Sequence, residues 1–157
     1  MTHKFWASYK KTLSIFAVAF LLNLIWENAH ALLYANYTFA YYFPRCLRAT
    51  LWDAGYITLV YAAIALLKKD WDWFAKDRRF TIPLVIALGL LTASVVELDA
   101  LLKNKWAYSA AMPLVPVIHV GLTPFLQLAI LSLVTYTVVV DYRELRNRFI
   151  PSFGKGG

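Results

Sequence analysis

Four long stretches of the chain are almost continuously apolar, and short polar or charged segments separate them. They run over about residues 12–34, 49–67, 80–102 and 113–140. Each is close to or longer than the roughly 20 residues with which an α-helix crosses the hydrocarbon layer of a membrane. The pattern predicts an all-α, polytopic membrane protein whose four transmembrane helices form an up-down bundle. No linker-like segment divides the sequence, so we expect residues 1–157 to form a single transmembrane domain.

Polar residues interrupt the second half of the first apolar stretch. The positions that share one face of a helix there are Asn23, Glu27, His30 and Tyr34. Trp26 lies beside that face. An ionisable side chain is costly at membrane depth, so this stripe is a candidate for function.

The same stretch also resembles a signal peptide. Lys10 and Lys11 precede the apolar run, and Ala29-His30-Ala31 has the small residues of a cleavage site. However, Trp26-Glu27-Asn28 is atypical of a cleavage region, and Leu32-Leu33-Tyr34 prolongs the apolar run. We therefore expect a retained transmembrane helix.

The second and third apolar stretches carry acids. Asp53 comes early in the second stretch, with Tyr56 almost one turn later, although an acid near a helix start can simply complement the helix dipole. Glu97 and Asp99 end the third stretch about 200° apart on a helix, so both cannot face the interior equally. Glu97 shares its face with small residues that suit close helix packing. Glu97 is therefore the predicted inward acid, and Asp99 is expected nearer the headgroups.

The fourth stretch holds a second polar stripe. On a helix, one face would carry Pro116, His119, Thr123 and Gln127. Gly121 and Pro124 would kink that helix and free backbone carbonyls.

Positive charge is distributed unevenly along the chain. Of the 16 lysines and arginines, 12 lie before the first stretch, between the second and third, or after the fourth. The other two connections hold only Arg45, Arg48, Lys103 and Lys105. The positive-inside rule then predicts that both termini are cytoplasmic. We expect a multi-pass protein of a bacterial inner membrane.

Composition narrows the function classes. The chain is 61% hydrophobic and only 16% charged, which is atypical of soluble proteins. The net charge of +7 is explained by cations beside anionic headgroups, so nucleic acid is not an expected partner. Membrane lipids are expected partners, and binding of an apolar small molecule or of a second copy of the chain stays open. The single Cys46 cannot form an internal disulfide.

The predicted topology brings six ionisable residues to one depth, in the outer half of the bundle. They are Glu27, His30, Asp53, Glu97, Asp99 and His119. Carboxyl groups held together out of water can retain a proton at neutral pH and then serve as general acids. Glu27 is the predicted principal acid or base. Glu97 and Asp53 would tune it, and the two histidines would relay protons or orient groups.

Nearby polar and aromatic residues form the predicted substrate-binding set. Aromatic rings suit an apolar ligand and stabilise positive charge that develops on it. The set comprises Asn23, Trp26, Tyr34, Tyr56, Asp99, Trp106, Tyr108, Thr123 and Gln127.

Two other interpretations of the polar residues stay open. They could hydrogen-bond helix to helix and only stabilise the bundle. Alternatively, Glu27-x-x-His30 has the spacing found in di-iron helical bundles, with Asp53, Glu97 and His119 as further ligands. A second Glu-x-x-His motif is missing, so we expect neither a metal nor a cofactor.

Several short motifs resemble those of known families. The motifs are Trp26-Glu27 before Leu33-Tyr34, Glu97 before Trp106-x-Tyr108 and Met112-Pro113, and then Gly121-Leu122-x-Pro124-x-x-Gln127. Together they resemble a family of small, uncharacterised bacterial membrane proteins. The segment from Asp99 to Pro116 also resembles, more loosely, carotenoid enzymes of the heterodimeric lycopene cyclase type. That group's paired acids after the proline are absent here. The resemblance implies at most an isoprenoid-like ligand and acid-initiated chemistry at a double bond.

Three functions are compatible with these patterns. The first is an enzyme that acts on a long lipid or isoprenoid by acid/base chemistry, as an isomerase or a cyclase does. The second is a non-enzymatic binder or carrier of a lipid, proton or cation. The third is a structural membrane subunit whose polar stripes pack against a partner.

Overall fold

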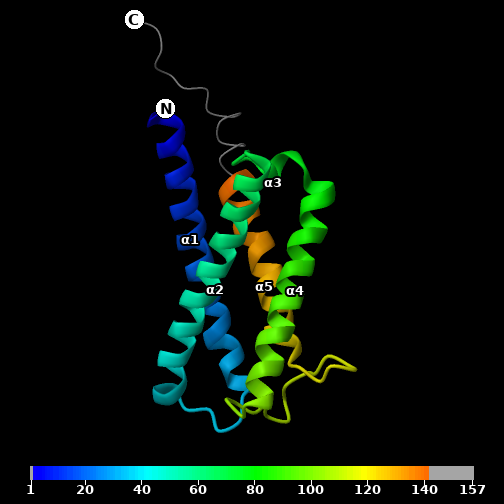
Figure 1. Cartoon of the computed structure of the whole chain (residues 1–157). Helices are drawn as coiled ribbons and strands as arrows, with labels where there is room; N and C mark the ends of the chain where they lie inside the picture. The colour runs from blue at the N-terminus through cyan, green and yellow to red at the C-terminus, as the bar shows by residue number, and fades with distance from the viewer. Residues whose placement is uncertain (1, 142–157) are drawn as a thin grey trace, which may run out of the picture.

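The computed structural model describes residues 2–141, and its four long helices form a bundle (Figure 1). The long helices are α1 (Thr2–His30), α2 (Phe39–Lys68), α4 (Arg78–Leu102) and α5 (Leu122–Tyr136). The short elements are η1 (Ala31–Leu33), α3 (Trp73–Lys76) and the π-helical η2 (Thr137–Asp141), which prolongs α5. The predicted all-α class is confirmed for these residues. The C-terminal cations Arg143, Arg146, Arg148 and Lys155 lie outside the described residues.

Four segments are long and apolar enough to cross a membrane, as predicted. They are Trp6–Leu33, Phe39–Lys68, Arg78–Leu102 and Leu122–Asp141. In Figure 1 the N-terminus, α3 and the end of α5 lie at one end of the bundle, which we call the terminal end. The connections 31–38 and 103–121 lie at the other end, which we call the loop end.

Three helices begin at residues that the apolar pattern did not indicate. The first helix was expected from about residue 12, but α1 begins at Thr2. The second helix was expected from about residue 49, but α2 begins at Phe39 and includes Pro44. Pro44 is exposed, in the second turn, where the lost hydrogen bond falls at the exposed end of the helix. The fourth helix was expected from residue 113, but α5 begins at Leu122, so Pro124 falls in its tolerant first turn.

The helices pack unevenly around the bundle. The closest pairs are α1 with α2 and α4 with α5, and α1 also packs along α5. Gly89 of α4 allows the close approach of α5, because a Cβ atom there would lie 2.5 Å from the backbone nitrogen of Ala129. By contrast, α2 and α4 hardly touch although they flank the same face in Figure 1.

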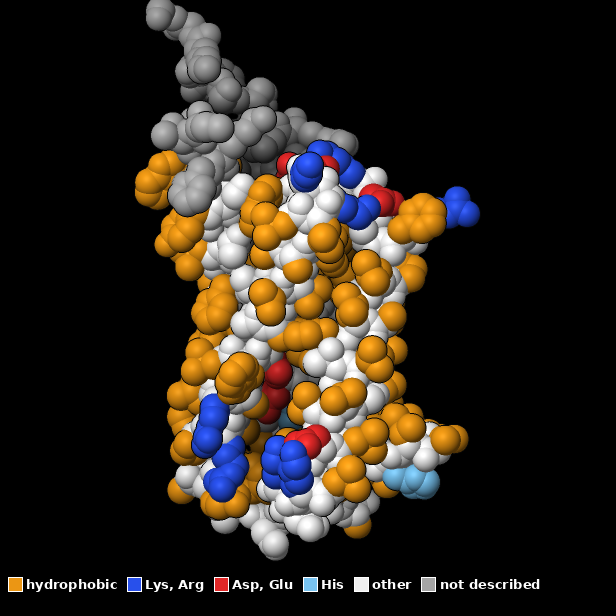
Figure 2. Space-filling model, in the orientation of Figure 1, with side chains coloured by type: hydrophobic (Ala, Val, Ile, Leu, Met, Phe, Trp, Pro, Cys, Tyr) orange, Lys and Arg blue, Asp and Glu red, His pale blue; other side chains and the backbone are white. Residues whose placement is uncertain are grey.

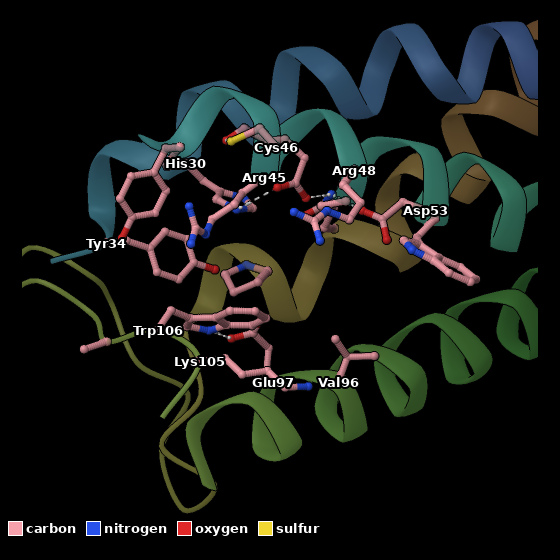
Figure 3. A pocket seen from close by; sticks show the side chains of 18 of the residues that line it. His30, Tyr34, Arg45, Cys46, Arg48, Asp53, Val96, Glu97, Lys105 and Trp106 are labelled. Atoms are coloured by element: carbon pink, nitrogen blue, oxygen red, sulfur yellow. Dashed lines mark hydrogen bonds and ion pairs between the residues drawn. The ribbon is translucent and has the colours of Figure 1, made fainter. Parts of the chain in front are cut away.

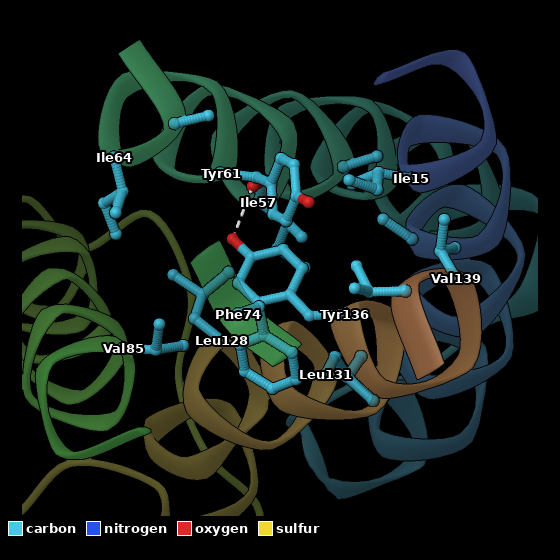
Figure 4. Close-up of a cluster of buried hydrophobic side chains, with 14 of the residues drawn as sticks. Ile15, Ile57, Tyr61, Ile64, Phe74, Val85, Leu128, Leu131, Tyr136 and Val139 are labelled. Carbon is cyan, nitrogen blue, oxygen red and sulfur yellow. Dashed lines mark hydrogen bonds between the residues drawn. The ribbon is translucent and has the colours of Figure 1, made fainter. Parts of the chain in front are cut away.

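Aromatic side chains fill the bundle at the terminal end. We call Tyr61, Trp73, Phe74 and Tyr136 the aromatic plug, because each is at most 1% exposed and their rings contact one another. The Tyr136 hydroxyl donates to the carbonyl of Ile57 at 2.7 Å (Figure 4). The Trp73 indole donates to the carbonyl of Tyr61 at 3.2 Å. The core therefore lies at this end.

The connection between α2 and α4 contributes to the core. Its short helix α3 turns Trp73 and Phe74 into the bundle. Lys11 of α1 anchors this connection by donating to the carbonyl of Trp71 at 3.0 Å and by pairing with Asp72. A lysine of the N-terminal basic segment thus also holds the plug in place.

Candidate functional site

A cavity of about 1000 Å³ lies at the loop end of the bundle. Its walls come from all four long helices and from both loop-end connections. Figure 2 shows acidic side chains at the bottom of the opening between α2 and α4. The opening therefore lies on the side of the bundle, between two helices that hardly touch.

Three carboxyl groups from three helices reach this cavity. Glu27 comes from α1, Asp53 from α2 and Glu97 from α4, and all three line the cavity wall. Glu27 and Glu97 are almost fully buried. The predicted convergence of these acids is what the structure shows, because alternating helix directions bring the end of α1, the first half of α2 and the end of α4 to one depth (Figure 1).

Gln127 of α5 links two of the acids. Its side-chain nitrogen lies 2.7 Å from Oε1 of Glu27, 2.8 Å from Oδ2 of Asp53 and 3.0 Å from Oδ1 of Asn23. An amide nitrogen carries two hydrogens, so it cannot donate to all three oxygens at once. A further hydrogen is needed within this group, and a carboxyl that holds a proton supplies one. The arrangement is therefore suited to holding a shared proton.

The third acid is held by the loop that joins α4 to α5. Glu97 accepts hydrogen bonds from the hydroxyl of Tyr108 and from the indole of Trp106, the latter at 3.3 Å. Burial and the neighbouring Glu97 raise the pKa of Tyr108, so its hydroxyl remains a donor. The loop is fixed to the α1–α2 connection by a backbone bridge between Tyr34 and Tyr108.

An aromatic wall closes the loop end of the cavity. Tyr34 packs against the rings of His30, Tyr42, Trp106 and Tyr108. Burial raises the pKa of Tyr34, and the negative charges of Glu97 and Glu27 raise it further. Tyr34 and Tyr108 of this wall are therefore uncharged at neutral pH.

His30 lies between the acids and the aromatic wall. Its Nε2 is 3.6 Å from Oε2 of Glu27, and the side chain is only 7% exposed. Its Nδ1 is buried and has no hydrogen-bond partner among the described residues. His30 therefore adds to the cavity wall a side chain whose second nitrogen has no partner among the described residues.

Positive side chains line the mouth of the cavity. Arg45 and Arg48 come from α2, and Lys105 comes from the loop that follows α4. Figure 3 shows Val96 and Glu97 facing α2 from the opposite wall, with Trp106 closing one end. The cavity thus has cations at its mouth and acids inside.

No known protein family, curated protein or solved structure matches the chain. The geometry of the cavity therefore carries the functional argument.

The structure brings most of the predicted site together. Seven of the predicted residues line the cavity: Glu27, His30, Tyr34, Asp53, Glu97, Trp106 and Gln127. Two more, Asn23 and Tyr108, hold lining residues by hydrogen bonds.

His119 is placed away from the predicted site. It lies in an exposed turn before α5, with a φ of 53°, and its Nδ1 is 3.1 Å from the carbonyl of Val117. The expected helical stripe does not form, because residues 113–121 form a turn closed by bonds such as Val115 N–H to Val120 O at 2.8 Å. Pro116 lacks the N–H that a continuing helix needs.

Four other predicted residues lie outside the cavity wall. Asp99 is partly exposed and pairs with Lys103 at 2.5 Å and with Lys105 at 2.8 Å. Tyr56 joins α2 to α4, since its hydroxyl donates to the carbonyl of Leu88 at 3.0 Å. The remaining two are Trp26, which packs against the core, and Thr123, whose hydroxyl is 3.5 Å from the Met112 sulfur.

The sequence also held a signal that the prediction did not use. Arg45, Ala49, Trp52 and Asp53 line the cavity and follow one face of a helix. That face becomes visible once α2 is extended back to Phe39. Sequence-based reasoning counted Arg45 and Arg48 only as loop charges.

The metal alternative named Glu27, His30, Asp53, Glu97 and His119 as ligands, and the structure places His119 in the exposed turn before α5. Within residues 2–141, no group of three or more histidine, cysteine, aspartate or glutamate side chains is arranged to hold a metal ion. The Glu27 and His30 pair is close, but Asp53 and Glu27 instead share the amide of Gln127.

Proposed function

We propose that the protein is a membrane enzyme that moves a proton on a long apolar molecule, of the lipid or isoprenoid class. The observation that carries the proposal is the cavity that opens sideways between α2 and α4 and contains three carboxyls from three helices. A side opening suits a ligand that arrives within the membrane. Buried acids beside an unpaired imidazole suit proton transfer.

The chemistry assigned to the cavity is a double-bond shift or ring closure. A carboxyl of the Glu27 and Asp53 pair gives its proton to one carbon of a double bond, which leaves a positive charge on the neighbouring carbon. The rings of Tyr34 and Trp106 stabilise that charge. Loss of a proton from another carbon to the carboxylate restores the acid, so the formula of the substrate does not change.

We also propose the orientation predicted by charge: both termini in the cytoplasm of a bacterium, and the cavity in the outer leaflet of its inner membrane. The distribution of lysine and arginine supports this orientation. The aromatic plug at the terminal end favours an enzyme or binder over a carrier, because a carrier needs access from both faces.

Deuterium exchange tests the proposal. The purified full-length protein is incubated in D₂O, and its co-purifying lipids are analysed by mass spectrometry. We expect a bound lipid to gain carbon-bound deuterium in the wild type, and Glu27→Gln to bind the lipid without exchange. Asp70→Asn, an acid at the opposite end, serves as the matched control and should exchange normally.

The other outcomes separate the competing functions. A bound lipid without exchange in the wild type would indicate a binder. If no lipid co-purifies and no exchange occurs, the polar residues only stabilise the bundle and the enzyme proposal is wrong.

A further inference from the structure

We propose that the cavity takes an amphiphile with an anionic phosphate headgroup, held at the mouth by Arg45, Arg48 and Lys105 while its apolar chain enters between α2 and α4. The proposal deepens the proposed function, on which it rests for what happens to the chain.

Two arginines of α2 supply the anion-binding groups. Arg45 donates to the carbonyl of Tyr41 at 2.9 Å, and its guanidinium lies 3.5 Å from the centre of the Tyr41 ring. Within residues 2–141, neither Arg45 nor Arg48 pairs with a carboxylate. The two residues are three apart, so they are neighbours on the helix surface. Guanidinium groups so placed match the several oxygens of a phosphate.

The inside of the cavity fixes the direction in which such a ligand enters. Glu27, Asp53 and Glu97 present acceptor oxygens to the interior, which disfavours an anion there. An anionic head is therefore stable only at the mouth, and the uncharged chain must point inward. Lys105 is held near the mouth by Asp99 at 2.8 Å.

The opening between α2 and α4 limits how deeply the apolar chain of the ligand can enter. Toward the terminal end, the opening is closed where the Tyr56 hydroxyl bonds to Leu88 and accepts from Thr92 at 3.0 Å. Asp53 lies five residues beyond Arg48 and eight beyond Arg45, which corresponds to about 7 to 12 Å along the helix. The carbon atoms that meet the acids therefore lie about that distance from the head.

Tryptophan fluorescence measures this binding directly, because Trp52 and Trp106 line the cavity. The full-length protein is placed in nanodiscs of phosphatidylcholine and titrated with hexadecyl phosphate brominated on its chain, which quenches nearby indoles. We expect saturable quenching at least about tenfold tighter than with the equally brominated hexadecanol, as charge-assisted hydrogen bonds imply. Equal affinity for the two probes would overturn the proposal.

Substitutions of the arginines test where the phosphate headgroup binds. Arg45→Gln combined with Arg48→Gln should weaken alkyl phosphate binding by about tenfold or more, and the corresponding double lysine variant should weaken it less. Arg79→Gln, an exposed arginine at the terminal end, is the matched control and should bind as the wild type does. Unchanged binding in the double glutamine variant would place the head elsewhere and contradict the proposal.

Two further experiments distinguish an alkyl phosphate in the cavity from a free phosphate ion and from the headgroups of the surrounding bilayer. Inorganic phosphate at the same concentration should not displace the alkyl phosphate, and displacement would indicate a site for the free ion. Val96→Phe, which adds bulk but no indole, should block the opening and abolish saturable quenching, because Val96 lines the cavity wall on α4. If quenching persists in that variant, the arginines meet only the headgroups of the surrounding bilayer, and the proposal fails.

Failure here can be distinguished from failure of the proposed function. Glu27→Gln should keep the affinity for alkyl phosphate within about twofold, since Glu27 lies inside the cavity, away from the proposed head position. Loss of deuterium exchange with the headgroup preference intact leaves this inference standing. A missing headgroup preference with exchange intact overturns only this inference.

Discussion

The two ends of the bundle are built from opposite kinds of side chain. The terminal end is closed by the aromatic plug, where the Tyr136 hydroxyl and the Trp73 indole each find a backbone carbonyl. The loop end holds a cavity of about 1000 Å³, three carboxyls and an imidazole nitrogen without a partner among the described residues. One end is filled by packed aromatic rings, and the other holds a side-opening cavity that contains buried polar groups.

The end of the bundle that stabilises the fold is therefore not the end that holds the candidate site. A cavity forfeits the packing contacts that its walls would otherwise make, and buried polar groups add a desolvation cost. Such an end must be held by structure elsewhere. The close contact of α4 with α5 at Gly89 and the plug beyond it supply that support. The comparison predicts large stability losses from changes at the plug and smaller ones from changes at the cavity.

The largest effect is expected from Trp73→Ala. The side chain is 1% exposed and contacts three other rings, so its removal leaves a cavity that costs about 3 to 5 kcal/mol of unfolding free energy. Thermal unfolding followed by circular dichroism measures the loss. Trp52→Ala is the matched control at the cavity mouth, where the indole is 76% exposed and the expected change is within about 0.5 kcal/mol. Equal losses would show that the aromatic plug stabilises the fold no more than the cavity mouth does.

The next largest effect is expected from Gly89→Ala. The added methyl would meet the backbone of Ala129, so α4 must move away from α5 at a cost of about 2 kcal/mol. Gly55→Ala in α2 is the control, because nothing lies within 4 Å of a Cβ atom there. That variant should gain up to about 1 kcal/mol in the same unfolding measurement. A neutral Gly89→Ala would show that the α4–α5 contact does not support the loop end.

A smaller loss is expected from Gln127→Leu. The variant leaves Glu27, Asp53 and Asn23 without their common donor. Inter-helix hydrogen bonds in membranes contribute little each, so the expected loss is about 1 to 2 kcal/mol. Thr123→Val, four residues earlier on α5, is the control and should change unfolding by less than about 0.5 kcal/mol. A loss as large as that of Trp73→Ala would mean that the polar network, rather than the plug, stabilises the fold.

Much of the cavity could be predicted from the sequence. Helical spacing and alternating helix direction were enough to bring Glu27, Asp53 and Glu97 together. They also indicated Gln127, whose long side chain reaches from α5 to the α1 and α2 acids. These inferences succeeded because they depend only on the period of the helix and on the order of the spans.

The turn before α5 and the early start of α2 could not be predicted in the same way. Residues 113–121 are apolar enough to continue a span, but they form a turn with positive φ at Val117 and His119. The prolines of this segment could also stand near the start of a helix. The apolar pattern alone therefore does not distinguish the turn from a helix. The start of α2 was predicted too late, because the aromatic and charged residues from Phe39 onward do not have the apolar pattern of a membrane helix although they are helical. The plug was missed because tertiary contacts, not local pattern, bury Trp73 and Phe74.

The smallest effect is expected from Asp70→Asn, which tests whether charges at the terminal end matter. Lys76 donates to Asp70 at 2.7 Å, and this bond, with one from the Asp72 amide, lowers the pKa of Asp70. A lowered pKa stabilises the fold above the ordinary aspartate pKa, and the stabilisation is lost as pH falls through the folded value. The site is near the surface, so the variant should lose less than about 0.5 kcal/mol at pH 7, and less still in high salt. The difference between the two proteins should shrink as the pH falls through the folded pKa of Asp70. A loss that matches Gln127→Leu and persists in salt would contradict the contrast between a terminal end held by packing and a loop end with buried polar groups.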